Sequence, residues 1–151
     1  FYRHFQSKQA LLEELAREQI TETPDEFDFE GLTAMGDTRS ELMVLARQFE
    51  KAAERQRPYL RLIEEVRMTE EGKAFELTAN EAMLEALMDW IATKPAAAGL
   101  DRAGLSALSM NVFGGWLFYV TKRQQGLAAG AIDRDILLGD WAGRWARMLD
   151  E

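Results

Sequence analysis

The sequence predicts an all-α domain, a helical bundle of about six helices. Apolar residues recur three and four positions apart, the period of a helix, in six segments of the 151-residue chain. Only three prolines occur, and the absence of Asn-Gly and Asp-Gly removes the usual hairpin signals of a β-sandwich or barrel. A composition of 47% hydrophobic and 29% charged residues is typical of one soluble globular domain.

Three helices are expected in the first half of the chain. Ser7 is a good N-cap for a helix over 7–21, in which leucines and alanines follow at helical spacing. Residues 21–37 are acidic and carry one proline and two glycines, which predicts a linker or mobile loop. The capping-box pattern from Thr38 to Glu41 then predicts a helix over about 39–55, and a shorter helix is expected over 58–68.

The second half is expected to hold three longer helices. Thr69, followed by two glutamates, predicts the start of a helix that runs to about residue 93 and is apolar along two stripes. Asp101 is expected to cap a helix over 101–125, and Asp133 a last helix over 133–150. We expect these last two helices to form a four-helix bundle with their counterparts in a dimer.

The run from Leu105 to Thr121 contains no charged residue, so membrane insertion has to be weighed. The run is slightly shorter than a membrane span requires, and it contains serine, asparagine and glycine. A helix buried between two layers, or inside an oligomer, is therefore favoured, and no membrane association is expected. The chain does not begin with Met, and we expect it to be a piece of a longer protein.

The residue types argue against an enzyme. The chain has no Cys, and a single histidine excludes multi-histidine metal sites. Neighbouring glutamates such as Glu64 and Glu65 do not face each other on a helix, and no glycine-rich phosphate loop is present. We therefore expect no metal, no cofactor and no catalytic residues. A net charge of −8 also argues against bulk binding of a polyanion, so contact with nucleic acid would have to involve the first few residues or a part outside this sequence.

The opening FYRHFQSKQALLEEL resembles the end of the DNA-binding domain in the TetR family of bacterial transcriptional regulators. The tail of the family's recognition helix is matched by Phe1, Tyr2, Arg3, His4 and Phe5. The start of the following helix is matched by Ser7, Lys8, Ala10 and Leu11. Two positions depart, because Gln6 stands where Pro is usual and Gln9 where Glu is usual. Beyond these fifteen residues the chain resembles the family only in its helical pattern.

The resemblance implies a cytoplasmic repressor-type regulator whose affinity for a DNA operator is changed by a small effector. Residues 1–6 would be the tail of a helix-turn-helix domain that mostly precedes Phe1. Residues 7–151 would form the effector-binding and dimerisation domain, linked by the helix over 7–21. By resemblance the DNA backbone would be contacted by Tyr2, Arg3, His4 and Lys8. The alternative is an all-α module that binds a small molecule or a protein and has no DNA role.

A mainly apolar effector cavity is expected between the helices, as is usual for ligands of helical bundles. The candidate lining residues are Phe49, Leu62, Val66, Phe75, Met83, Trp90, Asn111, Phe113 and Trp116. Asn111 is included because a buried amide needs hydrogen-bond partners, and a ligand could supply them. The alternative is that these residues are simply core and that Asn111 bonds to another side chain.

The expected dimer interface rests on small and aromatic residues of the last two helices. Mid-helix glycines cost stability, so Gly114 and Gly115 suggest close approach of another helix or of a ligand. Large apolar groups near the chain end favour an interface over an intramolecular core. The expected interface residues are Gly114, Gly115, Trp141, Trp145 and Met148.

Overall fold

The computed structural model of the chain describes residues 7–25, 27–126 and 131–151, with side chains throughout except at 9, 19–25 and 75–79. It confirms the all-α class, since the described residues contain seven α-helices and no strand. In chain order the elements are α1 (Lys8–Asp25), α2 (Phe29–Ala34), α3 (Thr38–Gln56), η2 (Arg57–Tyr59), α4 (Leu60–Arg67), α5 (Glu70–Ala92), η3 (Pro95–Ala97), α6 (Arg102–Gln124) and α7 (Arg134–Asp150).

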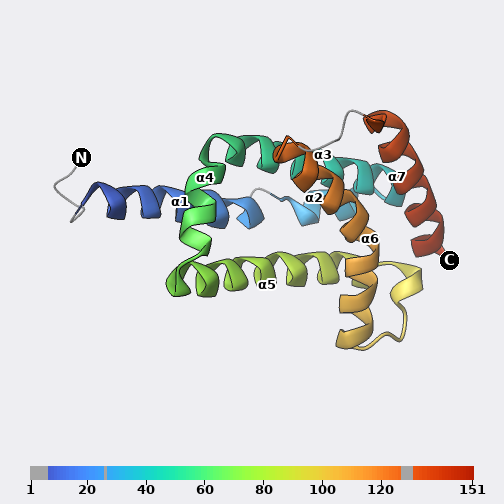
Figure 1. Cartoon of the computed structure of the whole chain (residues 1–151). Helices are drawn as coiled ribbons and strands as arrows, with labels where there is room; N and C mark the ends of the chain where they lie inside the picture. The colour runs from blue at the N-terminus through green and yellow to red at the C-terminus, as the bar shows by residue number, and fades with distance from the viewer. Residues whose placement is uncertain (1–6, 26, 127–130) are drawn as a thin grey trace.

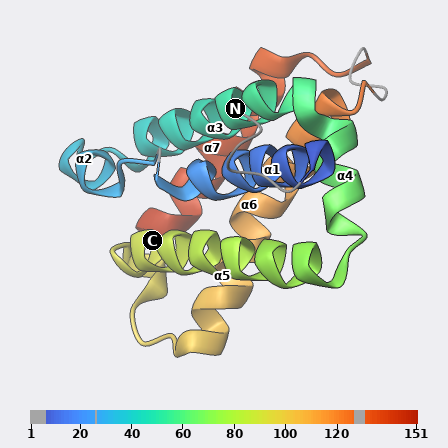
Figure 2. The ribbon, with the colours of Figure 1, turned by 90° about the vertical axis from the view of Figure 1, so that its left-hand side faces the viewer.

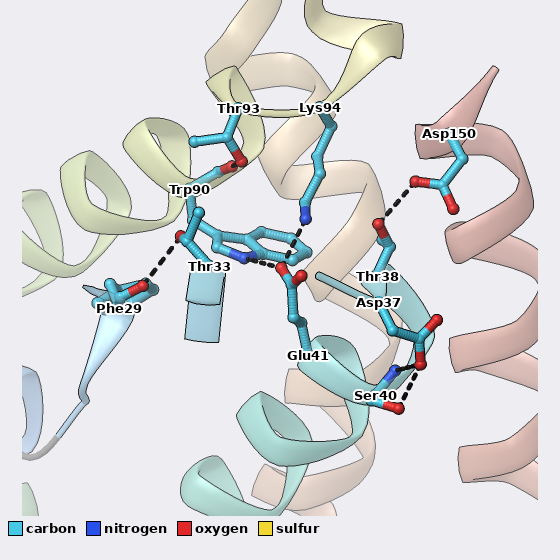
Figure 3. Close-up of polar contacts among 10 residues, drawn as sticks. All are labelled: Phe29, Thr33, Asp37, Thr38, Ser40, Glu41, Trp90, Thr93, Lys94 and Asp150. Carbon is cyan, nitrogen blue, oxygen red and sulfur yellow. Dashed lines mark hydrogen bonds and ion pairs between the residues drawn. The ribbon is translucent and has the colours of Figure 1, made fainter. Parts of the chain in front are cut away.

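Side-chain caps begin most of these helices, as the sequence predicts. Thr69 accepts the backbone N–H of Gly72, Asp101 that of Gly104, and Asp133 those of the second and third residues that follow it. The start of α3 differs from expectation. Asp37, and not Thr38, is its N-cap and accepts the N–H of Ser40 (Figure 3), while the Thr38 hydroxyl donates to Asp150 at the end of α7, 2.6 Å away.

The linker expected over 21–37 is largely helical, so that prediction is wrong. Helix α1 continues to Asp25, and the short helix α2 follows, capped by the carboxylate of Asp28. Phe27 and Leu32 are buried, and the Phe27 ring lies 4.8 Å from that of Phe49 on α3. The acidic composition suggested a solvated loop, but these two apolar side chains anchor the segment to the core and a capping aspartate starts a helix between them.

The helices pack around two clusters of buried apolar residues, one large and one small. In Figure 2, α1 lies between α3 and α5, and α4 crosses from the end of α3 to the start of α5. Helix α6 contacts α3 and α5, and α7 contacts α3 along its length, so α6 and α7 close one end of the molecule (Figure 1). The main core is built from α3, α5, α6 and α7 with α2, whereas a smaller cluster joins Ala16 of α1 to Ile63 and Val66 of α4.

Helix α6 contains the uncharged run. By length and composition it is the one helix among the described residues that could cross a membrane, and 33% of its most apolar window is buried inside the chain. The buried face carries Phe113 and Trp116, the centre of the main core. The opposite face exposes Met110 and Phe118, with Gly114 between them along the helix.

Candidate functional site

The start of α1 is the part of the expected DNA-contacting segment that the structure describes. The Ser7 hydroxyl accepts the backbone N–H of Ala10 at 3.1 Å, as expected of an N-cap, and Lys8 is exposed in the first turn. Tyr2, Arg3 and His4 lie outside the described residues. The exposed Lys8 ammonium at a helix N-terminus is therefore the one expected DNA contact whose position is known.

Helix α1 is fastened to the bundle behind it. Its Ala16 is fully buried against Ile63 and Val66 of α4. Its Arg17 guanidinium forms an ion pair with Glu71 in the first turn of α5, at 3.1 Å. The contact with α4 is therefore a buried one between apolar side chains, whereas the ion pair with α5 lies at the surface, where Glu71 is largely exposed.

Four of the expected effector residues come together in the centre of the main core. Phe113 is the hub, with ring centroids 6.1 Å from Phe49 and 5.9 Å from Trp90. Trp116 lies on the same face of α6, and its indole N–H donates to the carbonyl of Ala46 at 3.1 Å. These aromatic side chains contact one another and are almost fully buried, so the arrangement is that of a packed core.

The other expected effector residues lie elsewhere. Leu62 and Val66 belong to the small cluster with α1, and Met83 is half-buried against the main core. The side chain of Phe75 is outside the described residues. The expected burial of Asn111 is wrong, because this residue is exposed on α6. The first buried residues of α6 are Ser109, Val112 and Phe113, which share one face of the helix. Asn111 therefore falls on the opposite face.

A buried polar cluster near the core was missed by the sequence analysis. Glu41 of α3 accepts the indole N–H of Trp90 at 2.8 Å and the ammonium of Lys94 at 2.5 Å, both through Oε2 (Figure 3). Glu41 is 1% exposed and Lys94 9%, and the Lys94 ammonium also lies 4.7 Å from the centre of the Trp90 ring. The sequence did contain one indication of it. Glu41 stands four residues before Leu45 and therefore on the apolar stripe of α3, where a charged residue is expected to be buried and to need a partner.

A second polar site, which we call the arginine pocket, opens where α3, α6 and α7 meet. It is a cavity of about 300 Å³ lined by Glu50, Ala53, Glu54, Arg57, Val120, Arg123, Gln124 and Arg134. Arg134 at the start of α7 holds Glu50 of α3 with two hydrogen bonds of 2.8 and 2.6 Å. These bonds raise the pKa of Arg134 above its usual range. The lining residues come from distant parts of the sequence, so no local motif could reveal the pocket.

The residues expected at a dimer interface are divided between the surface and the core. Trp141 is buried in this chain's own core, where its indole N–H donates to Val112 at 2.7 Å, so the intramolecular alternative fits it better. Trp145 is half-buried, whereas Met148 is 55% exposed. A Cβ added at Gly114 or at Gly115 would meet no described atom within 4 Å, so this chain itself makes no close approach there.

No protein-family model, no curated protein and no solved structure matches this chain.

Proposed function

We propose that this chain is the effector-binding and dimerisation part of a ligand-responsive, DNA-binding transcriptional regulator of the repressor type. The observation that carries the proposal is the opening FYRHFQSKQALLEEL, which resembles the end of the TetR-family DNA-binding domain. From Ser7 onward this stretch is the N-cap and the first eight residues of α1. The all-helical body that follows is the architecture that such a regulator requires.

In this proposal α1 carries the signal between effector and DNA. The effector would favour one arrangement of the bundle, and α1 would transmit the change through its buried contact with α4 and its ion pair with α5. A coupling free energy of about 1–3 kcal/mol is enough for regulation. In the dimer the change would alter the spacing of the two DNA-reading heads.

The proposed effector is small and mainly apolar, and it binds beside Phe49, Trp90, Phe113 and Trp116. These side chains offer a continuous aromatic surface with few polar groups, which suits an apolar ligand. Because the rings are packed against one another, an effector entering between them has to move at least one of them. Such a displacement would change the packing of α3, α5 and α6 at once.

The proposed dimer is formed by α6 and α7. On α6 the apolar side chains of Met110 and Phe118 are exposed, Phe118 to 66%, and the half-buried Gly114 completes an apolar stripe between them. On α7, Ile136 is 71% exposed and Met148 also faces solvent. Large exposed apolar side chains separated by a glycine suit close contact with a second copy, in a four-helix bundle. With α6 partly inside the core and partly in this interface, we propose no membrane association.

A gel-shift comparison tests the proposal. A longer protein in which a helix-turn-helix segment precedes this chain should bind a specific operator, and the promoter region that it regulates is the first DNA to try. Residues 1–151 by themselves should not, because the base-reading part of the recognition helix is not among them and their net charge is −8. If the longer protein binds ligands and dimerises but shows no sequence-specific DNA binding, the alternative of an all-α binding module is correct. As a regulator the protein would act in the cytoplasm, without cofactor or catalytic activity.

A further inference from the structure

The arginine pocket concentrates positive charge in an acidic chain. Three arginines and two glutamates line it, and its volume is about 300 Å³, at the small end of ligand pockets. The chain as a whole has a net charge of −8. The lining of the pocket therefore has a positive formal charge, whereas the chain as a whole is negative.

The hydrogen bonds show which of these charges are already used. Arg134 is held by both carboxylate oxygens of Glu50 and also donates to the carboxylate of Asp135 at 2.7 Å, so it leaves no unpaired positive charge. Arg123 donates to the Tyr119 hydroxyl at 3.2 Å and has no carboxylate partner among the described residues. The Arg57 guanidinium likewise forms no hydrogen bond or ion pair with any residue that the structure describes. Among the described lining residues, Arg57 and Arg123 are therefore the two cations without a carboxylate partner, and Glu54 is the one carboxylate that is not paired with an arginine.

The rest of the pocket is not uniformly polar. Ala53 and Val120 supply the apolar part of its lining, which we call the apolar wall. The Gln124 amide is occupied, because its Nε2 donates to the carbonyl of Ala53 at 2.9 Å. A ligand here would therefore meet guanidinium groups and hydrocarbon, with Glu54 the one carboxylate that its charge would face unshielded.

We infer that the arginine pocket binds a small organic carboxylate. Its carboxylate group would lie against Arg57 and Arg123, whose planar guanidinium groups match the two oxygens of a carboxylate, and its hydrocarbon part would lie along Ala53 and Val120. A single negative charge fits two free cations beside Glu54 better than a dianion does. The inference is independent of the proposed regulatory function and of the aromatic effector site.

Binding measurements with matched probes test this inference. Benzoate and hexanoate are the probes, and benzamide is the uncharged control of nearly the same shape as benzoate. At constant ionic strength both carboxylates should raise the melting temperature of the chain in proportion to the logarithm of their concentration, whereas benzamide should not. The variants Arg57→Gln and Arg123→Gln should each weaken benzoate binding about tenfold or more, since each removes a charge-assisted hydrogen bond.

Two further variants make the result specific to the pocket. Arg61→Gln removes an exposed arginine of α4 that does not line the pocket, and it should bind benzoate like the wild type. Glu54→Gln removes the carboxylate that would repel the ligand, and it should bind benzoate more tightly. Because Glu54, Arg57 and Arg123 are exposed, these variants should fold, which their far-ultraviolet circular dichroism would verify.

Several outcomes would overturn the inference. One is binding of benzamide as strong as that of benzoate, and another is an unchanged benzoate affinity in both arginine variants. Inorganic phosphate that binds as well as benzoate would show a general anion effect without a role for the apolar wall. Weaker benzoate binding by Glu54→Gln, or no binding of either carboxylate at millimolar concentrations, would also contradict it.

Discussion

Glu41 and Lys94 form a buried ion pair that joins the start of α3 to the segment directly after α5. The carboxylate oxygen and the ammonium nitrogen lie 2.5 Å apart, and the indole N–H of Trp90 donates to the same oxygen. The two charged residues are separated by 53 positions in the sequence. Buried charges of this kind depend on each other, because removing either one leaves the other without compensation.

We expect Glu41→Ala to lower the free energy of unfolding by about 3–5 kcal/mol, since it leaves the Lys94 ammonium buried and unpaired. Urea unfolding measures the change, with Glu81→Ala, an exposed glutamate on α5, as the control. The double variant Glu41→Gln/Lys94→Met should be less destabilised than the sum of its single variants, because it removes both charges and keeps an acceptor for Trp90. Strictly additive effects would show that the two side chains are not coupled.

Trp116 is expected to be a structural residue of the core whether or not an effector binds beside it. Trp116→Ala should lower the free energy of unfolding by about 3–5 kcal/mol, because the side chain is 1% exposed and leaves a cavity when removed. Trp116→Phe should cost less, since it keeps most of the ring contacts. An unfolding curve of Trp116→Ala that overlays the wild-type curve would mean that the core is not packed as described.

The proposed apolar effector should change the fluorescence of the chain, because Trp90 and Trp116 both lie at the proposed site. A thermal-shift screen with apolar small molecules identifies candidates, and fluorescence titration then measures their affinity. Trp116→Phe should alter that affinity and leave the dimer intact. Loss of the dimer with unchanged affinity would show that the faces of α6 are assigned the wrong way round.

Phe118→Glu is expected to dissociate the proposed dimer, because it places a charge on the exposed apolar stripe of α6 without disturbing the buried face. Light scattering at micromolar concentration should show a dimer for the wild type and a monomer for this variant. Met68→Glu, at an exposed methionine after α4, is the matched control and should remain dimeric. A monomeric wild type at that concentration would rule out the proposed interface.

The capping aspartate of α3 should contribute to the acid sensitivity of the fold. The hydrogen bond from the Ser40 hydroxyl, followed by that from the Ser40 backbone N–H, lowers the pKa of Asp37 below its usual value of 3.8. A carboxyl whose pKa is lower in the folded state stabilises the fold above its unfolded pKa, and this stabilisation is lost as the pH falls through the folded pKa.

Asp37→Ser keeps an N-cap that does not titrate, so its stability should depend less on pH below about 4 than that of the wild type. Unfolding by urea at several pH values measures this difference. In a companion experiment, Ser40→Ala should return the pKa of Asp37 towards its usual value, as followed by nuclear magnetic resonance. An unchanged pKa in Ser40→Ala would contradict the assigned cause.

The helical pattern was predictable because it depends on residues that are close in sequence. The N-caps Thr69, Asp101 and Asp133 were identified correctly, since each acts on backbone groups two or three positions away. The six amphipathic segments were predicted within a few residues of the bounds of α1 and α3–α7. The helix α2 was not predicted, because the acidic composition of this segment is typical of a solvated loop. Phe27 and Leu32 hold the segment in place only through contact with the core, which the sequence does not show.

The periodicity of α6 could show that the helix is apolar, but it could not show which residues face the core. Its apolar residues surround most of the helix, so the choice between Asn111 on the inside and Asn111 on the outside depends on where α3, α5 and α7 pack. For the same reason Trp141 was expected at an interface and is found in the core, where Phe113 and Trp116 meet it.

Local chemistry in the sequence thus specified the class, the helices, most of their caps and the resemblance at the chain start. The joining of Glu41 to Lys94, and of Arg57, Arg123 and Arg134 into one pocket, arises only when α3 packs against the later helices. These residues are too far apart in sequence for any helical spacing to relate them, and their partners are chosen by the packing of whole helix faces.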